Sequence, residues 1–479
     1  MNILKKKNRI LNRIKEYTQG NSSITMRKIN IKNNEIYLFY IGAITDRNRV
    51  SGDIIKPILQ YNERGKLTID KIARSVIYID DIIFLKDEDN IIDYIFKGNS
   101  VIFMPSEDKY IVCNTLKVEK RNVTTPEIQT TLRGPRDAFI ENLETNLSLI
   151  RYRIKHRSLQ IDKYVVGTRT KTSVAMIYIK DIVNETYVAE IKKRLEKIDV
   201  DGIMDSGNIE KFIGEDRLQL FPQIGIIERP DSACSDMLKG KVCLMIEGSN
   251  LALIMPQTFF SFLDSGDDHY GNTFLSVFNK SMRLLSVFIT TSFSAIYVGL
   301  VSFHPDILPP QYALALASSR TTVPVNALLE ALLMEFVADM LKEASVRLPK
   351  QIGPAIGIVG TIVIGQAAVT AGLVSPLMVI IVSLTTMTSF IAPDFSIINP
   401  FKIVKFGLIL ITGTFGLFGF IIGITIIMLK LTSMDMMGVP YMEFVSPFSF
   451  REVKNYFLSN LKFLNKRPGY LKTKDDNRQ

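Results

Sequence analysis

Acidic residues near an apolar face are the first feature of this sequence with a possible chemical role. Residues 324–348 have an apolar face of Leu, Phe, Val and Met, and Glu330, Glu335 and Asp339 lie off that face. A confined opening that is lined by negatively charged carboxylates concentrates cations. In a symmetric ring of chains, these acids and Asp394 would form an acidic vestibule for cations. The alternative is the solvated face of an interfacial helix, which requires no function.

Small and hydroxylated residues form a second candidate site. In residues 353–372 small residues recur every three or four positions, which would give a helix one smooth stripe. Such a stripe either lets helices pack closely in lipid or leaves room for water and ions along a pore. The candidate pore or helix-packing residues are Gly353, Gly357, Thr361, Gly365, Gln366, Thr370, Thr386 and Ser389.

Motifs of enzymes and metal sites are missing from the sequence. It has no GxxxxGK[ST], GxSxG or HExxH motif, and no GxGxxG motif after a predicted strand. Its three histidines are widely separated, and its three cysteines lie outside any CxxC pattern. We therefore predict that the protein is not an enzyme and has no metal site and no cofactor.

The elements that position the candidate residues change in character at Arg283. Charged residues occur every few positions before it, whereas residues 284–303, 307–319, 353–390 and 406–429 contain no Asp, Glu, Lys or Arg. About 20 helical residues, at about 1.5 Å each, span a hydrocarbon core of about 30 Å. The first and last of these stretches each predict one span, residues 353–390 predict two, and residues 307–319 are too short to cross.

The part before Arg283 has the pattern of α/β domains. Apolar runs rich in β-branched residues alternate with helical periodicity, in two sets joined by a predicted bridging helix over residues 136–155. We expect an α/β N-terminal cytoplasmic region of two subdomains, followed by an all-α helical transmembrane domain. The expected divisions are the two subdomains at residues 1–135 and 136–265, a linker at 266–283, the membrane domain at 284–435 and a basic tail at 436–479.

Charge favours a membrane surface over nucleic acid. The net charge is +10, and anionic lipid attracts basic segments next to a membrane. The first residues, MNILKKK, have a basic cluster without an apolar run, so we expect no signal peptide. Basic tails tend to stay on the cytoplasmic side. The prediction is a multi-pass protein with four spans and with both the N-terminal domain and the C-terminal tail in the cytoplasm.

Several long segments resemble the A subunits of GerA-type spore germinant receptors. They are TLRGPRDAFIENLETNLSLIRYRIK (131–155), MPQTFFSFL (255–263), VPVNALLEALLMEFVADMLKEASVRLPKQIG (323–353), IVGTIVIGQAAVTAGLVSPLMVIIV (358–382) and GVPYMEFVSP (438–447). The resemblance implies an endospore inner-membrane subunit that acts with a transporter-like, nutrient-sensing B subunit and a lipoprotein C subunit. It supplies no catalytic residues.

The resemblance also implies a homo-oligomer, a pentamer, that forms a nutrient-gated cation channel and triggers germination. The alternative is a non-conducting scaffold or signalling subunit of the same receptor complex. A channel requires the small or hydroxylated stripe to face a central axis, whereas a scaffold places the stripe wholly against neighbouring helices.

Overall fold

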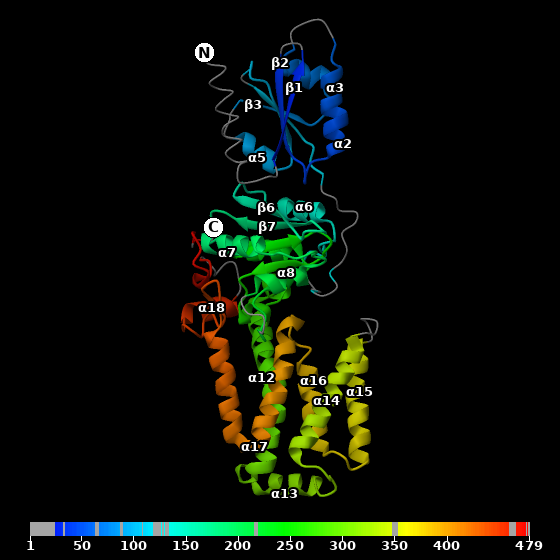
Figure 1. Cartoon of the computed structure of the whole chain (residues 1–479), viewed down its shortest axis with the longest axis vertical. Helices are drawn as coiled ribbons and strands as arrows, with labels where there is room; N and C mark the ends of the chain where they lie inside the picture. Colours follow the sequence, from blue (N-terminus) through cyan, green and yellow to red (C-terminus); the bar gives the residue numbers. More distant parts are fainter. Residues whose placement is uncertain are drawn as a thin grey trace.

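The computed structural model describes residues 24–31, 34–62, 67–86, 90–107, 109–117, 126, 129, 134–214, 219–346, 353–458, 466–475 and 477. Two α/β subdomains and a helical region follow one another along an elongated molecule (Figure 1). This confirms the predicted α/β N-terminal region and the predicted helical region after it. The segment MNILKKK lies outside the described residues.

The first subdomain is an antiparallel sheet that is buried on both faces. Its strand order is β1-β2-β4-β5-β3, with β1 (Ile24–Ile31), β2 (Asn34–Ile41), β3 (Ile82–Leu85), β4 (Ser100–Phe103) and β5 (Tyr110–Cys113). Successive residues of a strand point to opposite faces, so Ile36 joins one core cluster and Tyr37 joins the other. One face is covered by α2 (Arg47–Arg49), η1 (Val50–Ile55), α3 (Lys56–Gln60), α4 (Ile69–Lys71) and η2 (Ile72–Val76), and the opposite face by α5 (Asn90–Phe96).

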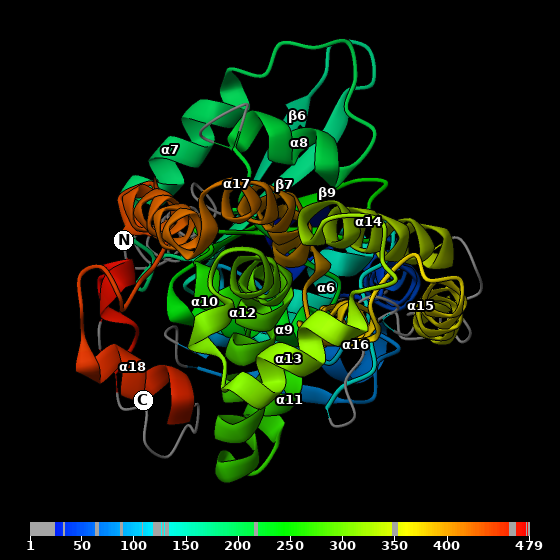
Figure 2. The same ribbon diagram turned by 90° about the horizontal axis from the view of Figure 1, so that it is seen from below.

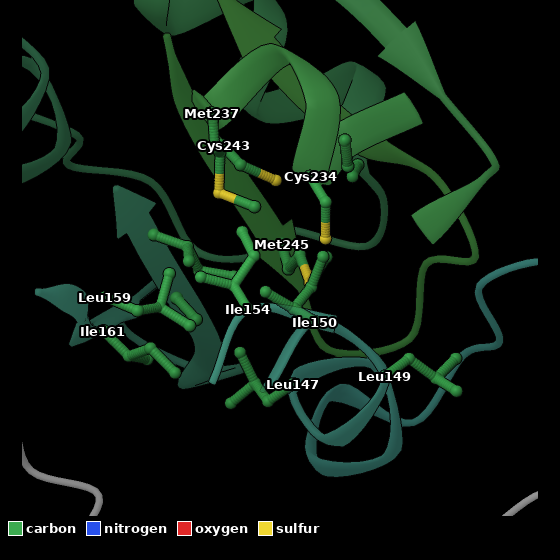
Figure 3. Close-up of a cluster of buried hydrophobic side chains, with 14 of the residues drawn as sticks. Leu147, Leu149, Ile150, Ile154, Leu159, Ile161, Cys234, Met237, Cys243 and Met245 are labelled. Atoms are coloured by element: carbon green, nitrogen blue, oxygen red, sulfur yellow. The ribbon is translucent and has the colours of Figure 1, made fainter. Parts of the chain in front are cut away.

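The second subdomain repeats the strand order of the first. Its order is β6-β7-β9-β10-β8, with β6 (Leu159–Val166), β7 (Thr172–Ile179), β8 (Gly225–Ile227), β9 (Val242–Ile246) and β10 (Ala252–Met255). Numbered within each subdomain, both sheets read 1-2-4-5-3, so they share one topology. One face is covered by α6 (Leu143–Arg153) and α9 (Pro230–Lys239), whose shared core with β9 is shown in Figure 3, and the other by α7 (Glu185–Glu196) and α8 (Ser206–Ile213).

Helix α6 is shorter than the predicted bridging helix. It begins after Asn142, whose side chain accepts a hydrogen bond from the backbone N–H of Thr145 and so caps the first turn. Leu147, Ile150 and other residues of α6 belong to the core of the second subdomain. Arg151 reaches the first subdomain, where its guanidinium lies 5.1 Å from the centroid of the Phe96 ring. The helix therefore belongs to the second subdomain and contacts the first.

The helical region begins earlier than predicted. The short helices α10 (Phe259–Phe262) and α11 (Gly266–Tyr270) precede α12 (Thr273–Phe303), so most of the expected linker, residues 266–283, is helical. Helices α14 (Ala327–Val346), α15 (Gly353–Thr370), α16 (Pro376–Thr388) and α17 (Phe395–Ser433) run beside α12 along the long axis of the molecule (Figure 1). After η3 (Pro305–Ile307), α13 (Pro310–Ser319) lies across the far end, as the view from below shows (Figure 2). Of the described helices, Thr273–Phe303 and Ser396–Ser433 are long and apolar enough to cross a membrane, with mean hydropathies of 1.9 and 2.2.

Helix α17 is a hairpin of two helical arms. Gly416 has φ 65° and ψ −154°, a backbone conformation that favours glycine, and it reverses the chain between the arms at 395–415 and 417–433 (Figure 1). The arms pack tightly, since a Cβ placed on Gly423 would lie 2.5 Å from Cδ1 of Leu408. The residues of the predicted span, 406–429, therefore do not form one continuous helix.

The C-terminal segment is part of the second subdomain and does not form a separate tail. It contains β11 (Asp435–Met436), β12 (Val439–Pro440), α18 (Phe450–Leu458) and η4 (Gly469–Leu471). Met436 and Leu471 lie in the same core cluster as β9. Tyr187 of α7 donates a hydrogen bond to the Leu471 carbonyl at 2.7 Å. The chain thus leaves the second subdomain at α12 and returns to it after α17.

Candidate functional site: buried charges between the helices

Glu335 is the centre of a polar cluster shared by four helices. It lies on α14 and is 1% exposed. Lys405 of α17 pairs with it at 2.6 Å and with Asp339, one turn further along α14, at 3.2 Å. Ser294 of α12 and Thr385 of α16 donate hydrogen bonds to its other oxygen, Thr385 at 3.1 Å. Because both carboxylate oxygens have partners, the cluster fixes α12, α14, α16 and α17 relative to one another.

A second buried acid, Glu330, lies nearer the beginning of α14. Arg320, which follows α13, pairs with it at 2.7 Å. Ser375 donates two hydrogen bonds to it, from the backbone N–H at 2.7 Å and from the hydroxyl at 2.6 Å. Tyr297 of α12 completes this group, with its hydroxyl 3.0 Å from the Ser375 hydroxyl and 3.2 Å from Arg320 Nη1. The group joins α12, α14 and the start of α16 at the far end of the helical region.

Glu330 and Glu335, two of the acids predicted to line a vestibule, therefore lie between the helices of a single chain. Glu330 and Glu335 have cationic partners between the helices, whereas the Asp339 side chain is 23% exposed. Asp394 caps α17 by accepting a hydrogen bond from Ser396 N at 2.8 Å. Burial raises the pKa of Asp394, which also lines a cavity of about 320 Å³ between α9 and the turn before α17. An acidic mouth formed by several chains stays a prediction.

The predicted stripe of small residues lies on α15. Gly353 and Gly357 are in its first turns, and the side chain of Thr361 is outside the described part of the structure. Gln366 and Thr370 are exposed, and the Thr370 hydroxyl donates to the Gln366 carbonyl at 2.9 Å within the helix. These two side chains are thus available to lipid, water or another chain.

Gly365 packs directly against α16. A Cβ at this position would lie 2.5 Å from Cγ1 of Val379. We expect Gly365→Leu to lower the free energy of unfolding by about 1–3 kcal/mol, because the added side chain has no room between the helices. Thermal unfolding in detergent measures the change, with Gly407→Leu as the control, since a Cβ on Gly407 meets nothing within 4 Å. Equal melting temperatures for the two variants would show that α15 does not pack on α16 at this point.

The predicted hydroxyl residues of α16 face the interior of the helical region. Thr386 and Ser389 are buried. The Ser389 hydroxyl donates to the Thr386 carbonyl at 2.6 Å and accepts from the Lys342 ammonium at 2.6 Å. Thr388 lies 3.0 Å from Thr290 of α12, oxygen to oxygen. Within one chain these hydroxyls join helices to one another.

Sequence reasoning missed the cationic partners of the acids. None of Lys405, Arg320 and Ser294 was among the candidate site residues. A signal was present, because a basic residue in an apolar helix needs an acidic partner. The acids of residues 324–348 were the nearest candidates in the sequence.

The beginning of α12 is fixed by two ion pairs to the segment that links it to the second subdomain. Lys280 is 1% exposed, pairs with Asp264 at 2.8 Å and donates to the Tyr456 carbonyl of α18 at 2.8 Å. Arg283 pairs with Asp268, whose side chain is fully buried, and donates to the Leu263 carbonyl at 3.1 Å. The helix that enters the Glu335 cluster is therefore held firmly at its other end.

A buried acid, Glu443, connects the segment after α17 to the second subdomain. Its side chain is buried, and the neighbouring groups that act on it include Thr258, Lys241 and Tyr470. Burial raises its pKa from 4.5 to about 7. The folded state therefore keeps this proton at pH values where the unfolded chain has lost it, so the free energy of unfolding falls as the pH rises from about 4.5 to about 7.

We expect Glu443→Gln to remove this dependence and to stabilise the protein above pH 7. The gain is at most roughly 3 kcal/mol, at about 1.36 kcal/mol per pKa unit. Melting temperatures between pH 4.5 and pH 8 test it, with Glu196→Gln, an exposed acid of α7, as the control. If the two variants show the same pH profile, burial does not hold the proton on Glu443.

The fold and the buried charges define a class of protein. It has two α/β subdomains of the same topology, followed by an apolar helical region with buried ion pairs between its helices. The chain belongs to the Bacillus/Clostridium GerA spore germination protein family, which it matches over residues 12–470. The family resemblance of the sequence is thereby confirmed.

Individual relatives cover nearly the whole chain. It is 36% identical over 445 residues to spore germination protein KA of Bacillus subtilis (strain 168), covering 92% of this chain and 82% of that protein. It is 32% identical over 471 residues to spore germination protein GerLA of Bacillus cereus, covering 97% and 96%. A solved structure also matches: the crystal structure of the N-terminal domain of the A subunit of the Bacillus megaterium spore germinant receptor GerK3, at 26% sequence identity. The match covers 52% of this chain and 94% of that domain, with a TM-score of 0.41.

Proposed function

We propose that this chain is the A subunit of a nutrient germinant receptor in the spore inner membrane, and that it assembles into an oligomeric, nutrient-gated cation channel that triggers germination. Family membership supports the role in germination. We propose a pentamer that acts with a transporter-like, nutrient-sensing B subunit and a lipoprotein C subunit. Neither nucleic acid nor a cofactor takes part in this function.

The observation that carries the proposal is the continuity of α12. One helix extends from the ion pairs of Lys280 and Arg283 at the soluble part to Ser294 in the Glu335 cluster. A rigid element that contacts two sites is suited to transmit a displacement between them. Movement of the second subdomain would thus change the packing of α12 against α14, α16 and α17, which is what a gate requires.

We further propose that α12, α14, α15, α16 and both arms of α17 cross the membrane, in place of the four spans expected from the sequence. The arms at 395–415 and 417–433 each approach the roughly 17–25 residues of a typical span. The hairpin at Gly416 is the feature that supports this topology, because it returns the chain toward the side on which it entered. The basic C-terminal segment and the N-terminal domain would then share the cytoplasmic side.

A non-conducting scaffold is the alternative, and Gly365 favours it. A scaffold places the small-residue stripe against neighbouring helices, and Gly365 contacts α16 within one chain. Gln366 and Thr370, on the face next to the stripe, favour the channel, because both are exposed and so leave polar side chains free to face a central axis.

Ion flux from liposomes that contain the assembled receptor separates the two functions. For a channel, we expect Gln366→Phe to reduce potassium efflux at least several-fold without loss of assembly, because the phenyl ring of the new side chain would narrow the pore. Thr425→Phe is the matched control, an exposed hydroxyl of α17 that bonds within its own helix. If the assembled wild-type receptor gives no flux under any activating condition, the chain is a scaffold.

A further inference from the structure

One buried lysine, at the end of the helical region that faces the second subdomain, has no ion-pair partner among the described residues. Lys342 of α14 is 6% exposed, its ammonium donates to the Ser389 hydroxyl at 2.6 Å, and it lies 4.7 Å from the centroid of the Phe390 ring. Among the described residues, no carboxylate lies within the 4.0 Å of an ion pair from this ammonium. A buried charge without a counter-charge is costly, by several kcal/mol per ion.

The surroundings of Lys342 contain an excess of positive charge. The charged side chains that act on it are Lys402, Asp339 and Lys405. Lys405 is already shared by Asp339 and Glu335. The charges of Lys342 and Lys405 balance those of the two acids, Asp339 and Glu335. Lys402, which is half-buried, therefore brings the net charge of this group to +1. An anion would therefore be attracted to this place.

The position in the fold indicates where such an anion comes from. Lys342 lies in the last turns of α14, Ser389 ends α16, and Lys402 lies near the beginning of α17. The end of α14, the end of α16 and the beginning of α17 lie where the helical region faces the second subdomain (Figure 1). In the membrane placement proposed above, on which this inference rests, that is the level of the lipid headgroups in the leaflet facing the soluble part.

We propose that Lys342 and Lys402, beside Ser389, bind the phosphate of an anionic phospholipid. Ammonium groups are ordinary donors to phosphate oxygens. Basic pockets between membrane helices on the cytoplasmic side are known to bind anionic headgroups. A bound phosphate would supply the counter-charge of Lys342 and would join α14 to α17 at the end of the helical region that faces the second subdomain.

Thermal unfolding of the full chain in mild detergent tests this site without requiring ion flux. We expect phosphatidylglycerol to raise the melting temperature by a few degrees, whereas phosphatidylcholine and inorganic phosphate should not. The increment should be lost in Lys342→Met and Lys402→Met, each compared with its own lipid-free value. Lys430→Met is the matched control, an exposed lysine near the end of the second arm of α17, and it should keep the increment.

Three results would overturn the proposal. Equal shifts with phosphatidylglycerol and phosphatidylcholine would show that the headgroup charge does not matter. A shift that persists in both Lys342→Met and Lys402→Met would place the lipid elsewhere. A full shift with inorganic phosphate alone would assign the site to the free ion. None of these outcomes depends on whether the receptor conducts ions, so the channel proposal is tested separately.

Discussion

Replacing Glu330 by alanine should lower the free energy of unfolding by about 3–5 kcal/mol, among the largest effects expected of a single change in this chain. The substitution would leave Arg320, whose side chain is 15% exposed, without its acidic partner, and breaking one side of a buried pair typically costs this much. Ser375 would also lose the acceptor of two hydrogen bonds at the start of α16. Thermal or chemical unfolding of the purified protein in detergent measures the loss.

Two further variants identify the cause of that loss. The double variant Glu330→Met with Arg320→Met removes both charges and should recover most of the stability, because an apolar pair of similar volume often replaces a buried ion pair without cost. Glu343→Ala changes an exposed acid of the same helix and should stay within about 0.5 kcal/mol of the wild type. If Glu330→Ala behaves like Glu343→Ala, the carboxylate at position 330 is not buried against Arg320.

Asp268→Ala should have an effect of similar size, about 3–5 kcal/mol, at the beginning of α12. Arg283 would lose the acid with which it is buried, while its bond to the Leu263 carbonyl would remain. We expect amide hydrogen exchange to increase in the first turns of α12 and not in α14, because the Glu335 cluster does not contain Asp268. Under the proposed function, germinant-induced flux should fall even where the assembly stays intact.

The control for this experiment is Asp435→Ala, an exposed acid of β11. It removes one negative charge from the same end of the helical region without breaking a side-chain ion pair that the described structure contains. If hydrogen exchange in α12 is the same in Asp268→Ala as in Asp435→Ala, the ion pair of Arg283 with Asp268 does not hold the beginning of α12.

Local patterns were sufficient to predict much of the fold. The alternation of β-branched runs with helical periodicity identified two α/β sets, and the loss of charge after Arg283 identified the apolar helical region. Both signals come from short-range periodicity, which a sequence displays directly. The shared 1-2-4-5-3 strand order was not visible, because it depends on which strands pair over long distances and not on the runs themselves.

The features that were mispredicted depend on single residues or on distant contacts. Residues 406–429 contain no charged side chain, and the reversal rests on the one positive φ of this helix, at Gly416. The C-terminal segment has many basic residues, which suggested a free tail, although Leu471 is fully buried in the second subdomain. The acids Glu330 and Glu335 were recognised, whereas their partners were not, because Lys405 is 70 positions away from Glu335.

The return of the chain to the second subdomain has a mechanical consequence. Because the helical region begins at α12 and ends in a segment whose Met436 and Leu471 are built into the subdomain core, one folded unit holds both of its ends. The helical region is therefore attached to the second subdomain at both ends, so it cannot move away from it as it could if only one end were attached. A rotation of the second subdomain would act on α12 and on the second arm of α17 together.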